Sequence, residues 1–119
     1  MRREIQKRLI NLSVDIISYC KELKTDFVSQ HLSQQIIRAS TSCALHYGEA
    51  QGASSMKDFV HKSSEILKEL RETQAGLQII RQSNLAKNDE KAEVLYKECS
   101  ELVAIFHKTV MTAKAKINN

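Results

Sequence analysis

The residues best able to do chemistry lie in the middle of the chain. His46 and Glu49 are three positions apart, so they would share one face of a helix, and imidazole and carboxylate groups are ligands that zinc accepts. His61 follows further along. The spacing is not diagnostic, because many helices carry such a pair and the HExxH pattern of zinc enzymes is absent. A solvated or hydrogen-bonded histidine is the simpler interpretation, so we predict no metal site and no cofactor.

Nucleophilic catalysis is disfavoured by the same sequence context. Ser40, Ser42 and Cys43 precede His46 closely, but side chains on one helical face lack the strained turn and the oxyanion donors that acyl transfer uses. The sequence also has no glycine-rich phosphate loop. The three cysteines are odd in number and widely spaced, which is typical of reduced, mostly buried thiols. We therefore predict a protein without enzyme activity.

The elements that position these residues are predicted to be helices. The 119 residues are 42% hydrophobic and include no proline and only three glycines, too few turn formers for a many-stranded β-fold. Apolar residues recur at alternating spacings of three and four. This pattern predicts helices over about 5–23, from between Thr25 and Ser29 to Gly52, over about 28 residues from near Ser55, and from about Asn88 to at least Ala113.

These four helices predict an all-α fold, an antiparallel up-down four-helix bundle forming a single domain over residues 1–119. We expect Gly52 to end the second helix in the left-handed conformation and Ser55 to form a capping box with Asp58. The predicted core consists of Leu9, Leu12, Ile16, Ile36, Ile66, Leu70, Leu77, Leu95, Leu102 and Phe106. No apolar run approaches the roughly 20 residues of a membrane span, and no secretory signal is visible, so we expect a cytoplasmic protein.

A hairpin about Gly52 would bring polar residues of the second and third helices together. It would also place Tyr47 opposite Phe59, Cys43 opposite Ser63 and Ile36 opposite Leu70. We call the polar residues the polar stripe: Gln35, Arg38, Ser42, His46, Glu49, Glu65, Glu69 and Glu72. Arg38 has apolar neighbours in the sequence, so we expect its guanidinium to be paired, with Glu69 the best-placed carboxylate. The stripe is either a structural seam of ion pairs or a groove for a ligand or nucleic acid.

Basic residues favour one end of the predicted bundle. In an up-down bundle, the N-terminus, the turn between the second and third helices and the C-terminus lie at the same end of the bundle. We call the cations expected there the basic pole: Arg2, Arg3, Lys7, Arg8, Lys57, Lys62, Lys114 and Lys116. They could bind phosphate backbones electrostatically, as RNA or DNA would offer, or they could be ordinary solvated termini. The six aromatic residues are predicted mostly at core positions, which argues against base stacking.

Four segments carry a family resemblance: residues 32–42 (LSQQIIRASTS), 48–50 (GEA), 57–59 (KDF) and 67–74 (LKELRETQ). Together they resemble the four-helix bundle family encoded within intervening sequences of bacterial large-subunit ribosomal RNA genes. The chain departs from the family pattern at Ala44, His46 and Ala50. The resemblance implies a ring-like homopentamer, no established catalysis and a nucleic-acid role.

The resemblance also leaves a second function open. A related bundle is the accessory subunit of reverse transcriptases in diversity-generating retroelements, where it binds RNA and protein. The alternative function is therefore a structural or protein-interaction module, such as a reverse-transcriptase accessory subunit, without direct nucleic-acid binding.

Overall fold

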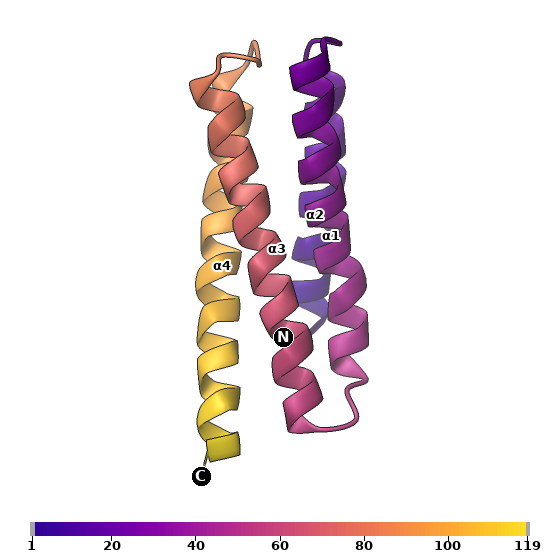
Figure 1. Ribbon diagram of the computed structural model, residues 1–119, viewed down its shortest axis with the longest axis vertical. Coiled ribbons are helices and arrows are strands. Elements are labelled where there is room, and N and C mark those ends of the chain that lie inside the picture. The colour runs from indigo at the N-terminus through magenta and orange to yellow at the C-terminus, as the bar shows by residue number, and fades with distance from the viewer. Residues whose placement is uncertain (1, 119) are drawn as a thin grey trace.

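The protein is an all-α bundle of four helices. The computed structural model describes the backbone of residues 2–118 and the side chains of residues 3–118. The helices are α1 (Arg2–Lys21), α2 (Phe27–Gln51), α3 (Met56–Gln82) and α4 (Asp89–Asn118). They alternate in direction, each packs against the next, and α4 also contacts α1 (Figure 1). No helix within the described residues is both long and apolar enough to cross a bilayer.

The core confirms the predicted apolar stripes. All ten predicted core residues are buried, and Leu9, Ile16, Ile66, Leu70, Leu77 and Leu102 are fully enclosed. The expectation that aromatic residues lie mostly in the core is wrong for Phe27, whose exposed fraction is 81% and whose ring stacks on His31. Ile10 and Val14 are also exposed, because α1 buries only one side of its apolar surface.

Most of the predicted helix ends are confirmed. Asp26 caps α2 by accepting a hydrogen bond from the backbone N–H of Ser29 at 2.8 Å. Ser55 caps α3 by accepting from Asp58 N–H at 3.1 Å. The reciprocal bond differs from a standard capping box, because Asp58 accepts from Ser54 N–H, one residue before the cap. Asn88 Oδ1 accepts from the backbone N–H of Glu90 and so begins α4.

The conformation predicted for Gly52 is wrong. Gly52 ends α2 with φ −98°, outside the left-handed region, and its N–H donates to the carbonyl of Glu49. Within residues 2–118, the residue with positive φ is Asn84, at 55°, in the turn between α3 and α4. Asparagine tolerates this region because its short polar side chain can hydrogen-bond locally. The chain therefore reverses direction after α2 without using the special freedom of glycine.

The register predicted between α2 and α3 is shifted. Cys43 Sγ points to the carbonyl of Ile66, three residues beyond Ser63, and Ile36 lies against Gly76, six residues beyond Leu70. Side chains on a helix lean toward its N-terminus, so on antiparallel neighbours they lean in opposite directions. An α2 side chain that leans in this way contacts an α3 residue of higher number than the residue whose Cα lies directly opposite. The predicted partners Tyr47 and Phe59 nevertheless line one common groove.

Candidate functional site

The basic pole is formed by the ends of three chain segments. The start of α1, the α2–α3 connection and the end of α4 lie toward the same end of the bundle, although α1 stops short of the others (Figure 1). Of the predicted cations, Arg3, Lys7, Lys57, Lys114 and Lys116 are exposed. Among the described residues, none of these five has an ion-pair partner. These side chains are available to an anionic partner.

Three predicted members of the pole differ from this group. The side chain of Arg2 lies outside the described residues. Lys62 Nζ pairs with Asp58 Oδ2 at 3.3 Å, one helical turn away. Arg8 makes a two-pronged pair with Glu98, at 3.0 Å from Nε and 2.6 Å from Nη2, and reaches Glu101 at 3.4 Å. These hydrogen bonds link α1 to α4. The hydrogen bond to Glu98 also raises the pKa of Arg8.

A groove opens at the basic pole where α1 is shorter than its neighbours. It has a volume of about 690 Å³ and is lined by all four helices. Its apolar floor includes Tyr47 and Phe106, whose rings meet edge to face at a centroid distance of 5.9 Å. Lys108 and Lys116 of α4 line the same groove. The basic pole therefore combines exposed cations with partly accessible apolar surface.

A second basic groove, which the sequence reasoning missed, lies along the seam between α3 and α4. Its volume is about 660 Å³, and its lining includes Lys68 and Arg71 of α3 with His107 and Lys114 of α4. The signal that could have revealed it is helical spacing, because positions 57, 64, 68 and 71 share one face of α3 and positions 107, 111 and 114 share one face of α4. Basic side chains therefore extend beyond the pole.

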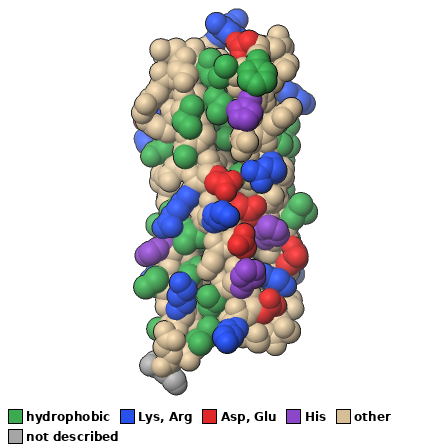
Figure 2. Space-filling view, in the orientation of Figure 1, with side chains coloured by type: hydrophobic (Ala, Val, Ile, Leu, Met, Phe, Trp, Pro, Cys, Tyr) green, Lys and Arg blue, Asp and Glu red, His purple; other side chains and the backbone are tan. Residues whose placement is uncertain are grey.

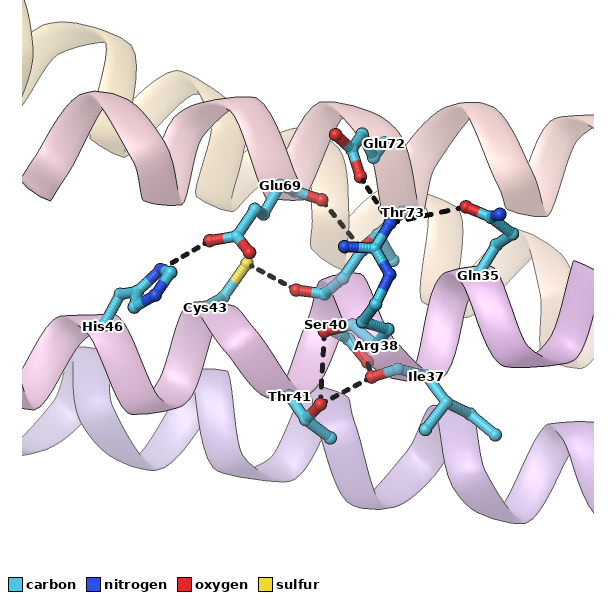
Figure 3. A network of polar contacts seen from close by, with 11 residues as sticks. Gln35, Ile37, Arg38, Ser40, Thr41, Cys43, His46, Glu69, Glu72 and Thr73 are labelled. Carbon is cyan, nitrogen blue, oxygen red and sulfur yellow. Dashed lines mark hydrogen bonds and ion pairs between the residues drawn. The ribbon is translucent and has the colours of Figure 1, made fainter.

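The polar stripe lies along the seam between α2 and α3 (Figure 3). His46 Nδ1 lies 2.7 Å from Glu69 Oε1, and Glu69 is buried. In the tautomer with the proton on Nδ1, His46 donates this hydrogen bond to the Glu69 carboxylate. The Glu69 carbonyl accepts from Thr73 Oγ1 at 2.9 Å. Both groups of Glu69 are therefore engaged within the seam.

The predicted pairing of Arg38 with Glu69 is wrong. Arg38 Nη2 lies 3.6 Å from Glu72 Oε2 and donates to Gln35 Oε1 at 3.4 Å, while His46 takes Glu69 (Figure 3). The side chain of Arg38 is also 63% exposed rather than enclosed by apolar neighbours. The register shift described above explains why Arg38 pairs with Glu72 instead of Glu69, since Glu72 lies almost one turn beyond Glu69 on α3. These contacts support the structural interpretation of the stripe.

The other stripe residues make a looser arrangement. Ser42 and Glu65 are half-buried, and Glu49 is exposed. Neither Glu49 nor His61 joins His46 and Glu69, and no group of three His, Cys, Asp or Glu residues in the described part of the chain could hold a metal ion. His46 and Glu69 therefore form a two-residue contact between helices.

The cysteines sit where a thiolate is disfavoured. Cys43 is buried beside the stripe, and its Sγ lies 3.3 Å from the carbonyl of Ala39. Burial, followed by the nearby charge of Glu69, raises the pKa of the Cys43 thiol. Burial also raises the pKa of Cys99 to about 12 and raises that of Cys20. Because the thiolate is the reactive form, these surroundings suit cysteines that act as small apolar residues.

Comparison with known proteins gives a family and a solved structure to which the chain is similar. Residues 2–108 match the family described as 23S rRNA-intervening sequence protein. A solved structure from Bacteroides thetaiotaomicron, described as a protein with unknown function from the S23 ribosomal protein family, is 27% identical with a TM-score of 0.77. The match covers 89% of this chain and 97% of that one. No curated protein matches the chain.

Proposed function

This chain belongs to the 23S rRNA-intervening sequence protein family, and on that premise we propose that it is a non-enzymatic, homo-oligomeric scaffold that binds RNA through its basic pole. The observation that carries the proposal is the group of five exposed, unpaired cations at one end of the described bundle. Proteins that neutralise phosphates with such side chains release counterions, so binding depends on charge and on salt. Binding through these groups needs no metal, cofactor or nucleophile.

Self-association is supported by apolar surface that the bundle leaves uncovered. Ile10 and Val14 lie one turn apart on α1 and are about half exposed, and Leu45 on α2 has an exposed fraction of 71%. Grouped apolar residues on a protein surface mark interaction sites more often than scattered ones do. We propose that such surfaces join copies of this chain, and that the assembly is the homopentamer implied by the family resemblance.

The experiment is size-exclusion chromatography coupled to light scattering, with and without total RNA. At 13.5 kDa per chain, a pentamer has a mass of about 68 kDa, five times the chain mass. We expect this mass, co-elution with RNA in about 50 mM salt and release in about 200 mM salt. A monomer would contradict the scaffold, and an oligomer that never carries RNA would favour the protein-interaction alternative, such as a reverse-transcriptase accessory subunit.

A charge-reversal pair tests the basic pole itself. Arg3→Glu combined with Lys7→Glu should abolish RNA co-elution, because both side chains are exposed and unpaired among the described residues. Arg8 is left unchanged, since its reversal would break the link to Glu98. The control combines Lys24→Glu with Lys87→Glu, which changes net charge equally at exposed positions of the opposite end. Equal loss in both variants would contradict a role specific to the pole.

A further inference from the structure

The exposed face of α3 carries basic side chains over more than half of the helix. Lys57, Lys68 and Arg71 project within about 60° of one another around the helix axis, at 100° per residue. They span 14 residues, or roughly 21 Å at 1.5 Å per residue. Lys114 of α4 lines the same groove as Lys68 and Arg71. We call these four residues, Lys57, Lys68, Arg71 and Lys114, the basic band.

One carboxylate lines the α3–α4 groove beside the basic band. Among the residues that line the α3–α4 groove, Glu72 is the one acidic side chain, and it pairs with Arg38 across the other seam at 3.6 Å. Within residues 3–118, no ion pair engages any member of the basic band. Charge that is not neutralised within the chain is available for a partner.

The two long seams of α3 therefore differ in chemistry. In Figure 2, carboxylates and histidines gather over the α2–α3 side, whereas Lys and Arg side chains follow the lower half of the α3–α4 side toward the basic pole. The positive region thus continues from the end of the bundle along its side. A rod-like polyanion fits such a strip better than a compact anion does, because successive charges meet successive cations.

We infer that the sugar-phosphate backbone of RNA lies along the basic band, running from the basic pole up the α3–α4 groove to Arg71. This inference rests on the proposed function and adds the path that the RNA follows. The groove has no Phe, Tyr or Trp in its lining, its one ring is that of His107, and its apolar members are Leu67, Val110, Met111 and Ala75. A single imidazole is no platform for successive bases, so recognition uses phosphates without regard to base sequence.

Two methionines report the path directly. Met111 is about half exposed in the α3–α4 groove, and Met56 lines the groove at the basic pole. The experiment labels the methionine methyl groups with ¹³C, assigns them with Met111→Leu and Met56→Leu, and titrates in RNA duplexes of about 12 base pairs, long enough to span the band. Two duplexes of unrelated sequence should both shift the Met111 signal at low salt, with equal affinity.

The outcomes separate the path from the proposed function. A shift at Met56 with none at Met111 means that RNA binds at the pole alone, which overturns the inference and keeps the proposed function. No binding of either duplex defeats the proposed function itself. A Met111 shift with polyglutamate and none with RNA also overturns the inference, because the band would then be a site for acidic protein segments.

Charge-neutralising variants give a second, independent readout. Lys68→Gln with Arg71→Gln should leave the fold intact, since both side chains are exposed, and should lower the slope of log affinity against log salt by about two. The control, Lys24→Gln with Lys87→Gln, removes the same charge from exposed positions at the other end of the bundle. An unchanged slope in the band variant overturns the inference.

Discussion

At Gly76, α3 lies so close to Ile36 of α2 that no side chain fits between them. A Cβ added there would collide with Cγ2 of Ile36, which is buried and β-branched. Such a side chain has little rotamer freedom with which to move aside. Only glycine, which carries a hydrogen atom in place of a side chain, therefore fits at position 76. Its presence inside α3 nevertheless lowers helix stability by about 1 kcal/mol relative to alanine.

Gly76→Ala should therefore destabilise the protein by about 1–3 kcal/mol, because the strain of overpacking exceeds the gain in helix propensity. The matched control is Gly48→Ala in α2, where an added Cβ meets nothing within 4 Å. That variant should be more stable by about 0.5–1 kcal/mol. Urea unfolding followed by circular dichroism measures both, and equal effects of the same sign would contradict the close approach.

Sequence reasoning placed the stripe residues at one seam, but it assigned Arg38 to the wrong carboxylate. The spacing of Arg38, His46 and Glu69 placed them on facing surfaces, which the structure confirms. The choice of partner depends on a shift of a few ångströms along the helices and on the lean of each side chain, which periodicity does not encode. Arg38 therefore meets Glu72, and His46 takes the buried carboxylate of Glu69.

At the scale of elements, short polar side chains decide where each helix begins. Asp26, Ser55 and Asn88 were all identifiable from sequence, because a residue of this type stood before each apolar stripe. The end of α2 was placed correctly at Gly52 but for a reason that does not apply, since its φ is negative. Helix starts follow from side-chain chemistry, whereas the dihedral angles of a turn depend on how the connected helices pack.

Ser55→Ala should lower stability by about 1 kcal/mol, because the backbone N–H of Asp58 loses its acceptor at the start of α3. Ser54→Ala is the control. Ser54 is equally exposed and contributes its backbone N–H, which alanine keeps. Thermal unfolding should show a lower midpoint for Ser55→Ala and no change for Ser54→Ala. The same midpoint for the two variants would show that Ser55 is not the cap.

The acids at the helix starts predict how the bundle responds to pH. A hydrogen bond from Ser29 N–H lowers the pKa of Asp26, one from Ser54 N–H lowers that of Asp58, and one from Arg81 lowers that of Asp89. A carboxylate with a lowered pKa in the folded state stabilises that state fully above the ordinary Asp pKa of about 3.9. The stabilisation is lost as the pH falls from there toward the lowered value.

We therefore expect the unfolding midpoint of Asp89→Asn to fall below that of the wild type at pH 7 and to approach it as the pH falls through the lowered pKa of Asp89, because the Arg81 contact is then lost in both. Asp15→Asn is the control, since the Asp15 carboxylate makes no hydrogen bond or ion pair within the described residues. A difference between Asp89→Asn and the wild type that stays constant across this range would contradict the assignment.

At the scale of the whole molecule, the bundle is polarised in charge. The formal net charge is +4, and the cations of the basic pole and the basic band lie at one end and along one side, whereas Lys24 and Lys87 are exposed at the other end. The pole was predictable because bundle topology fixes which termini and turn come together. Its extension over Lys68 and Arg71 was not recognised, since it depends on which face of α3 the bundle leaves open. Arg8 was also misjudged as available, because its partner Glu98 is 90 residues away.

The salt dependence of RNA affinity tests this account most directly. Fluorescence anisotropy of a labelled duplex should give a straight line of log affinity against log salt with a slope of about −3 or steeper, as several phosphates are neutralised. Two unrelated base sequences should fall on the same line. Affinity that does not change with salt, or the absence of binding in about 50 mM salt, would contradict an RNA scaffold that works by charge.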